Sequence, residues 1–119
     1  MTDAQTLIDL SYLELMADGD DFMKKTMLDM LIEEMPPEIE KLRGAYLSQD
    51  FVALKDVAHK MKSTLSFVGN DAMTEANATL ELIGKEATDM PRAAQHLEVM
   101  EERFTLVFPA LQAESAKLD

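Results

Sequence analysis

The chain has no cysteine among its 119 residues, which limits both its structure and its chemistry. Neither a disulfide framework nor a cysteine-based zinc site is possible, and a reducing, cytoplasmic location is favoured. No apolar run is long enough to span a bilayer. The first residues, MTDA, lack the basic and apolar segments of a signal peptide. We therefore expect a soluble cytoplasmic protein that does not contact the membrane.

Positive charge is also scarce. Eleven Lys and Arg residues face 23 Asp and Glu residues, so the formal net charge is −12. This excess argues against nucleic acid or an anionic membrane as the main partner. The chain also has no glycine-rich phosphate loop and no carboxylate cluster suited to magnesium, so we expect it to bind no ATP, metal or other cofactor.

What the sequence does contain is a helical apolar period along its whole length, with no convincing alternation of period two. Short connections between long amphipathic segments favour helices that run alternately up and down. We therefore predict an all-α fold, an antiparallel up-and-down four-helix bundle with a short additional N-terminal helix. The length suits one domain over residues 1–119 with a modest core.

Capping and breaking residues set the expected helix boundaries. A short first helix covers about residues 7–17 and stops at Gly19. The second opens at Asp20 or Asp21, and Pro36–Pro37 should kink or interrupt it because neither proline donates a backbone N–H. Its inward side chains are expected to be Phe22, Met27, Leu28, Leu31, Met35, Ile39, Leu42 and Tyr46.

The last three helices follow in the same way. The third runs from a cap at Asp50 to Val68, where Gly69 ends it, and Asn70 or Asp71 caps the fourth. The fifth begins near Pro91 and should bend at Pro109. Their expected inward residues beyond Val68 are Met73, Ala76, Leu80, Ile83, Ala87, Leu97, Met100, Phe104, Val107, Phe108 and Leu111. Most of the ten methionines fall on such positions and are expected to fill gaps in the core.

One histidine lies on the wrong side of the third helix to be a core residue. At about 100° per residue, the apolar stripe falls within roughly 50° of one direction, and His59 lies about 140° from its centre. The stripe consists of Leu54, Val57, Ala58, Met61, Leu65 and Val68. Lys62 follows His59 by three residues and Lys55 precedes it by four, while Ser63 and Ser66 are small enough to leave the ring accessible. An accessible imidazole between two cations suits an anionic reaction partner.

The run from His59 to Gly69, HKMKSTLSFVG, resembles the signature of the histidine-phosphotransfer (HPt) family. That signature is His-x-Leu-Lys-Gly-Ser, with a glycine ten residues after the histidine. His59, Lys62 and Gly69 occupy the three key places, and Met61 stands where leucine is usual. Ser63 replaces the family's glycine after the lysine, which could slightly hinder the approach of a partner. Upstream, the run GDDF at residues 19–22 is similar to the family's entry into its second helix.

The resemblance implies a phosphoryl carrier and not an enzyme. His59 would accept a phosphoryl group from an aspartyl phosphate on a response-regulator receiver domain and pass it to another receiver, and a hybrid histidine kinase is a possible further partner. A solution imidazole has a pKa of about 6.5, so near neutral pH much of it is a free nucleophile, and Lys62 would balance the transferred charge. The protein is expected to be a monomer. The receiver should dock over Lys55, Ser63, Ser66 and Gly69, and near apolar residues of the first helix or the start of the second.

The hairpin between the third and fourth helices suggests an orienting partner for His59. If the turn centres on Asn70, residue 59 lies level with residue 81. Glu81 would then accept a hydrogen bond from one ring N–H and leave the other nitrogen to react. Lys85, one turn further, would assist in binding phosphate.

Two functions of other classes compete with this interpretation. Asp56-x-x-His59 is half of a carboxylate–histidine metal pair, but His96 has Ala93 at the matching position, so the second half of a di-metal site is missing. His96 is therefore expected to be an ordinary surface or boundary residue. The other alternative is a helical-bundle adaptor that binds a signalling partner without chemistry.

Overall fold

The computed structural model describes residues 7–119, and this part of the chain contains five α-helices and no β-strand. A short helix comes first and four longer ones follow. They are α2 (Ser11–Ala17), α3 (Asp21–Leu47), α4 (Phe51–Val68), α5 (Asp71–Glu86) and α6 (Met90–Ala116). The predicted all-α class is confirmed.

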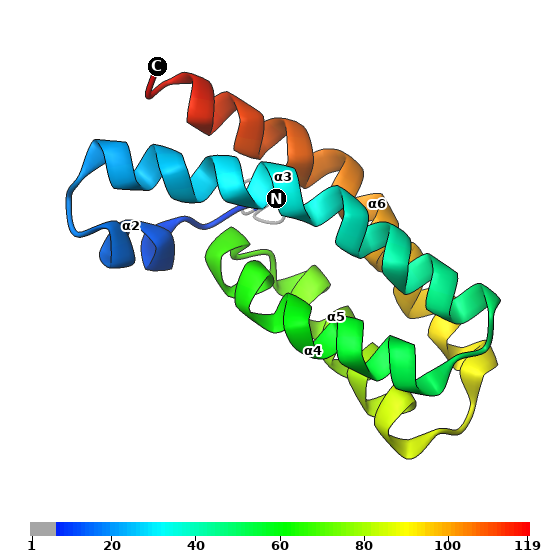
Figure 1. Cartoon of the computed structure of the whole chain (residues 1–119). Helices are drawn as coiled ribbons and strands as arrows, with labels where there is room; N and C mark the ends of the chain where they lie inside the picture. Colours follow the sequence, from blue (N-terminus) through cyan, green and yellow to red (C-terminus); the bar gives the residue numbers. More distant parts are fainter. Residues whose placement is uncertain (1–6) are drawn as a thin grey trace.

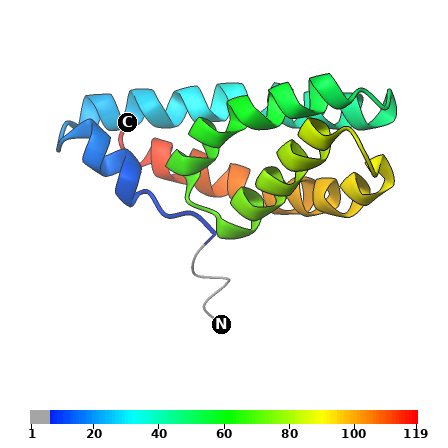
Figure 2. The same ribbon diagram turned by 90° about the horizontal axis from the view of Figure 1, so that it is seen from below.

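The four long helices form an up-and-down bundle (Figure 1). Helix α3 packs against α4 and α6, and α5 packs against the same two helices, so the four enclose one core. The connections, residues 48–50, 69–70 and 87–89, are so short that consecutive helices run antiparallel. Helix α2 lies at one end of the bundle, against α3 and α4 (Figure 2). The predicted bundle with a short N-terminal helix is confirmed.

Three helices begin at the polar caps that the sequence indicated. The side chain of each cap accepts a hydrogen bond from the backbone N–H three residues later, which pairs a donor that would otherwise be free. The pairs are Asp20 with Met23 at 3.1 Å, Asp50 with Ala53 at 3.0 Å, and Asn70 with Met73 at 3.0 Å. Gly69 ends α4 in the left-handed conformation, with φ of +73°.

The first helix is shorter than expected, because it begins at Ser11 and not at Leu7. Asp9 explains the difference. Its backbone N–H donates to the carbonyl of Val68 at 2.9 Å, and its carboxylate accepts hydrogen bonds from the N–H and hydroxyl of Ser11. These bonds hold the residue in a non-helical conformation at the end of α4. Helix α2 ends at Ala17, and its left-handed C-cap is Asp18, one residue before the predicted Gly19.

Two prolines do not break α3. The helix runs without interruption from Asp21 to Leu47 through Pro36 and Pro37, so the predicted interruption is wrong, and the alternative of a kink stays a prediction. The neighbours Met35 and Ile39 are buried in the bundle, and this packing outweighs the loss of two backbone hydrogen bonds. Helix α6 likewise continues through Pro109, where the expected bend stays a prediction.

Most of the predicted inward side chains are buried, including those of Met35, Met61, Met73 and Met100. Phe22 is the clearest exception, since it is 80% exposed. It lies in the first turn of α3, where the apolar period continues but no other part of residues 7–119 covers that face. The remaining exceptions are Ala87, which is exposed in the left-handed cap of α5, and five side chains that are only partly buried, those of Met27, Tyr46, Val57, Phe104 and Phe108.

No helix within residues 7–119 combines the length and the apolar character that crossing a membrane requires.

Candidate functional site

His59 projects outward from the middle of α4. Its side chain is 70% exposed, whereas Ala58 and Met61 beside it are fully buried on the opposite face. The orientation predicted from the helical period is confirmed. The imidazole is therefore accessible to a large partner without any movement of the bundle.

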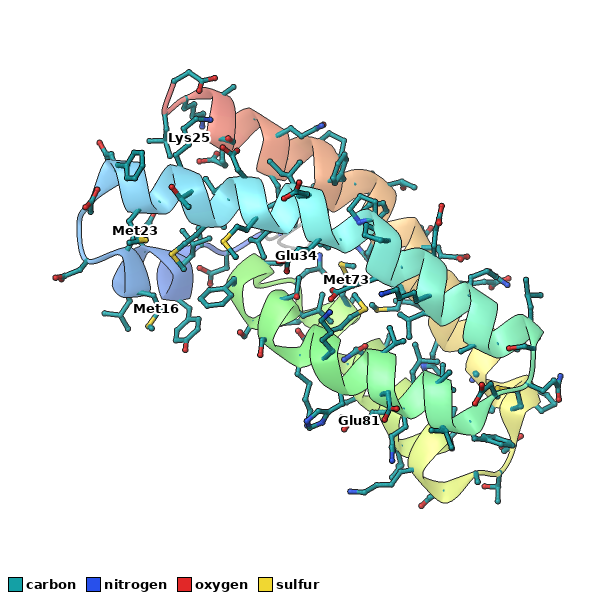
Figure 3. All side chains as sticks on the ribbon, in the orientation of Figure 1. Met16, Met23, Lys25, Glu34, Met73 and Glu81 are labelled. Carbon is teal, nitrogen blue, oxygen red and sulfur yellow. The ribbon has the colours of Figure 1, made fainter. Side chains whose placement is uncertain are left out.

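One nitrogen of the ring is already engaged. Nδ1 of His59 lies 2.8 Å from Oε2 of Glu81. Glu81 lies on the neighbouring α5 (Figure 3). The contact predicted from the hairpin register is thus present. An ionised carboxylate only accepts hydrogen bonds, so Nδ1 must donate. In the neutral ring, Nε2 is then the nitrogen that carries the free lone pair.

Lys62 contacts the same carboxylate through its other oxygen. Its ammonium group lies 3.2 Å from Oε1 of Glu81, so Glu81 bridges the imidazole and the lysine. The hydrogen bond from His59 lowers the pKa of Glu81 below its usual range, burial opposes this shift, and the Lys62 ammonium adds to the lowering. Glu81 is therefore ionised at neutral pH, although its side chain is only 17% exposed.

The other two lysines predicted at the site are Lys55 and Lys85. The ammonium of Lys55 lies 3.9 Å from a carboxylate oxygen of its neighbour Asp56. Lys85 is exposed on α5, one turn beyond Glu81.

The predicted small residues near the ring are exposed. Ser63 lies one turn after His59 on α4, and the hydroxyl of Ser66 donates to the carbonyl of Ser63 at 2.6 Å. Ser63 also lines a shallow apolar hollow between α3 and α4, together with Met27, Met30, Leu31, Glu34, Thr64 and Phe67. The two serines are therefore small, accessible residues on the α4 surface that follows His59.

Gly69 lies about 15 Å along α4 from His59, at 1.5 Å per residue. Its neighbours are in the N-terminal segment, because a Cβ atom at position 69 would be 2.3 Å from the carbonyl oxygen of Asp9. These contacts give Gly69 a packing role. Its expected contact with a partner stays a prediction.

Two α5 residues that were not predicted from the sequence set the register between α4 and α5. A Cβ atom on Gly84 would be 2.6 Å from the backbone nitrogen of Lys55, so the two helices meet closely there. The buried amide of Asn77 donates to the carbonyl of Ala58 at 2.8 Å, directly before His59. Glycine and asparagine are poor helix formers. Their presence in the interior of a predicted helix was the signal that the sequence offered.

A buried carboxyl group on α3 was also missed. Glu38 is 4% exposed, with Lys60 at 3.8 Å and the Thr64 hydroxyl at 3.4 Å. Burial raises the pKa of Glu38 above its usual range, and the nearby Lys60 ammonium opposes the shift. The contact keeps Lys60 on the α3 side of α4, while Lys62 lies on the α5 side.

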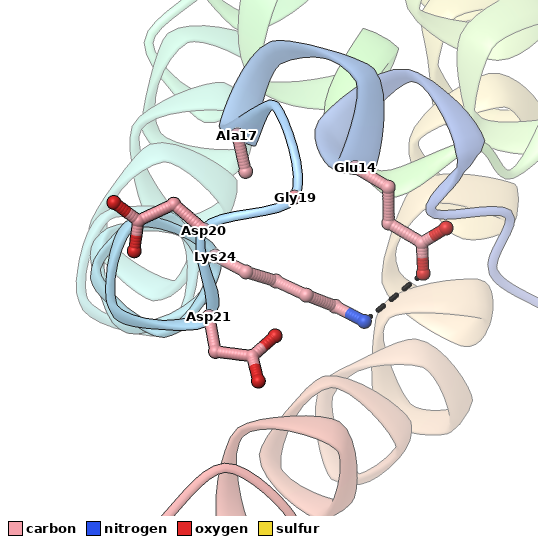
Figure 4. A pocket seen from close by; sticks show the side chains of 6 residues that line it. All are labelled: Glu14, Ala17, Gly19, Asp20, Asp21 and Lys24. Atoms are coloured by element: carbon pink, nitrogen blue, oxygen red, sulfur yellow. Dashed lines mark hydrogen bonds and ion pairs between the residues drawn. The ribbon is translucent and has the colours of Figure 1, made fainter.

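Two polar regions lie away from His59, an acidic hollow and the surroundings of His96, and neither forms a metal site within residues 7–119. Within residues 7–119, no group of three or more His, Cys, Asp or Glu side chains is arranged to hold a metal ion. An acidic hollow of about 190 Å³ lies between α2 and α3, and there Lys24 pairs with Glu14 at 2.9 Å (Figure 4). His96 is partly buried on α6, in agreement with the boundary position expected for it.

Comparison with known proteins connects this geometry to a family. The family model described as Hpt domain matches residues 26–115. Among solved structures, the chain is similar to histidine-containing phosphotransfer protein B (HptB) from Pseudomonas aeruginosa PAO1, with a TM-score of 0.83 and 21% identity. The match covers 94% of this chain and 96% of that one. Comparison with curated protein sequences gave no significant match.

Proposed function

Because the chain belongs to the Hpt domain family and has a role in histidine phosphotransfer, we propose that His59 is the residue that carries the phosphoryl group. One observation supports this assignment above all others. The ring of His59 is 70% exposed, while its Nδ1 is held by Glu81. The free Nε2 therefore points a nucleophilic lone pair toward solvent.

The proposed transfer proceeds at Nε2. Its lone pair forms the N–P bond as the P–O bond to a partner's aspartate breaks, and the aspartate leaves as a carboxylate. The ring then carries a positive charge, which the Glu81 carboxylate balances. Lys62 supplies a cation beside the transferred group, and Lys85 and Lys55 add positive potential from one turn away. Onward transfer is the same step in reverse, to the aspartate of another partner.

We propose response-regulator receiver domains as the partners, with a hybrid histidine kinase as a possible source of the phosphoryl group. Ser63 and Ser66 leave the approach to His59 open. Large apolar side chains are exposed on α2 and at the start of α3, including Met16 and Met23 (Figure 3). Such a surface favours contact with another protein. The partner would supply the magnesium ion and the aspartate, so the chain itself acts as a carrier. A monomeric state and a cytoplasmic location stay predictions.

The test is incubation with a phosphorylated receiver domain. The wild-type chain should acquire an acid-labile phosphate, and His59→Ala should acquire none while still binding the receiver. His96→Ala is the matched control and should be labelled as the wild type is. If the wild type binds phosphorylated receivers but is never labelled, the adaptor alternative is correct.

The role of Lys62 can be tested in the same assay. Lys62→Met removes the cation and should slow labelling of His59, whereas Lys62→Arg keeps the positive charge and should retain most of the rate. Equal rates in all three proteins would show that Lys62 does not stabilise the transferred group.

A further inference from the structure

A phosphohistidine donates its phosphoryl group readily only when the other ring nitrogen is protonated. As the P–N bond breaks, its electron pair returns to Nε2. With a proton on Nδ1 the ring leaves as neutral imidazole, whereas without that proton it would have to leave as an imidazolate anion. The phosphoryl group passes to a carboxylate oxygen, and the proton stays on Nδ1. The rate of donation therefore follows the fraction of phosphohistidine that is protonated at Nδ1.

Glu81 is placed to control that fraction. Its Oε2 lies 2.8 Å from Nδ1, and its side chain is mostly shielded from solvent. A hydrogen bond between a cationic donor and a carboxylate is about twice as strong as one between neutral groups. A neighbouring negative charge also favours the protonated form of a ring over its neutral form.

In the unphosphorylated protein, Lys62 weakens the effect of the Glu81 charge on the ring. Its ammonium lies 3.2 Å from Oε1, so the charge of Glu81 is shared between the lysine and the ring. The Lys62 side chain is 55% exposed. A phosphoryl group on Nε2 offers this ammonium a second anion. When Lys62 contacts it, more of the Glu81 charge acts on Nδ1.

The other charged groups around the ring are paired elsewhere or lie further away. On α4, Asp56 lies beside Lys55, and Lys60 lies beside Glu38 of α3. On α5, Lys85 is exposed one turn beyond Glu81. Within residues 7–119, Glu81 is the charged group in direct contact with the imidazole.

We propose that the negative charge of Glu81, and not its hydrogen bond alone, holds the proton on Nδ1 of phosphorylated His59 and so keeps the protein a phosphoryl donor at neutral and mildly alkaline pH. This inference rests on the proposed function. It assigns Glu81 a positioning and charge-setting role that acts through His59.

Glu81→Gln separates the two roles, because the amide oxygen still accepts a hydrogen bond but carries no charge. Both proteins would be phosphorylated with potassium phosphoramidate, which needs no partner. The ¹⁵N shifts of the His59 ring would then be followed against pH, and loss of phosphate by ³¹P NMR. The variant's Nδ1 should lose its proton at lower pH. Above both midpoints, phosphoryl loss and transfer to a receiver should be about tenfold slower for each unit of the shift.

Asp56→Asn is the charge-matched control. It removes one negative charge from α4, three residues before His59, without touching the ring contact. Its midpoint should stay near that of the wild type. The proposal is overturned if Glu81→Gln titrates like the wild type, or if Asp56→Asn shifts the midpoint as far as Glu81→Gln does. If the wild-type His59 takes up no phosphoryl group at all, the proposed function itself has failed, which is a different outcome.

Discussion

Gly84 of α5 lies against the backbone of Lys55 on α4, with no room between them for a side chain. A Cβ atom at position 84 would be 2.6 Å from the amide nitrogen of Lys55 and 2.8 Å from the carbonyl oxygen of Phe51. This contact is one turn away from the pair formed by His59 and Glu81. The close approach of the two helices is what lets the carboxylate of Glu81 reach across to the imidazole.

The first prediction concerns Gly84→Ala. Alanine favours a helix over glycine by about 0.5–1 kcal/mol, but the new methyl group would push against rigid backbone, at a cost of about 1–3 kcal/mol. We expect a net loss of stability in urea unfolding and slower phosphorylation of His59, because α5 and Glu81 move away from α4. Gly44→Ala is the control, since a Cβ atom there meets nothing within 4 Å. It should stabilise the protein, and a similar gain at position 84 would contradict the packing argument.

The second prediction compares two left-handed glycines. Gly69 and Gly19 have φ of +73° and +78°, so alanine is strained at both. At position 69 the methyl group would also collide with Asp9, whereas the space around Gly19 is open. Gly69→Ala should therefore destabilise the protein more than Gly19→Ala does. Hydrogen exchange should show the amide of Asp9, which donates to Val68, losing its protection in Gly69→Ala only.

A third prediction follows from the buried Glu38. Burial raises its pKa above the ordinary value of 4.5, so the folded protein keeps this proton to higher pH than the unfolded chain does. Its contribution to stability is therefore fully present below pH 4.5 and is lost as pH rises through the folded pKa. Glu38→Gln has no such titration and should be more stable than the wild type at pH 7.5, by on the order of 1 kcal/mol.

The measurement for Glu38 is the difference in unfolding free energy between the two proteins at pH 4 and at pH 7.5. The advantage of Glu38→Gln should grow with pH. An advantage that stays constant or shrinks would show that the contacts with Lys60 and Thr64 fully compensate the buried charge.

The fourth prediction contrasts two residues of α4. Leu65 is 1% exposed, so Leu65→Ala should cost about 2–5 kcal/mol through lost burial and the cavity left behind. His59→Ala leaves no cavity in the core, and its unfolding midpoint should stay close to that of the wild type. Thermal unfolding of both variants, followed by circular dichroism, tests the contrast. Equal destabilisation would mean that the His59–Glu81 contact is a main support of the bundle.

Features that depend on one helix alone could be predicted from the sequence with few errors. The caps Asp50 and Asn70, the left-handed Gly69 and the outward direction of His59 all depend on local backbone geometry and a fixed angular period, and all are found as predicted. Phe22 shows the limit of this approach, because the period says which face a side chain lies on but not whether another helix covers that face.

Relations between helices were only partly predictable. Counting residues outward from the turn at Asn70 placed Glu81 level with His59, because a short turn fixes the register of the two helices that it joins. It did not reveal that Lys62 contacts the same carboxylate, nor that Gly84 and Asn77 hold α5 close to α4.

What the sequence by itself determined is the set of helices, their apolar faces and the histidine left outside them, because each depends on residues a few positions apart in the chain. Only the tertiary structure decided that α3 continues through two prolines, that Glu38 is buried against α4, and that one carboxylate bridges His59 and Lys62. Those outcomes depend on distances between helices, which packing sets and no local pattern encodes.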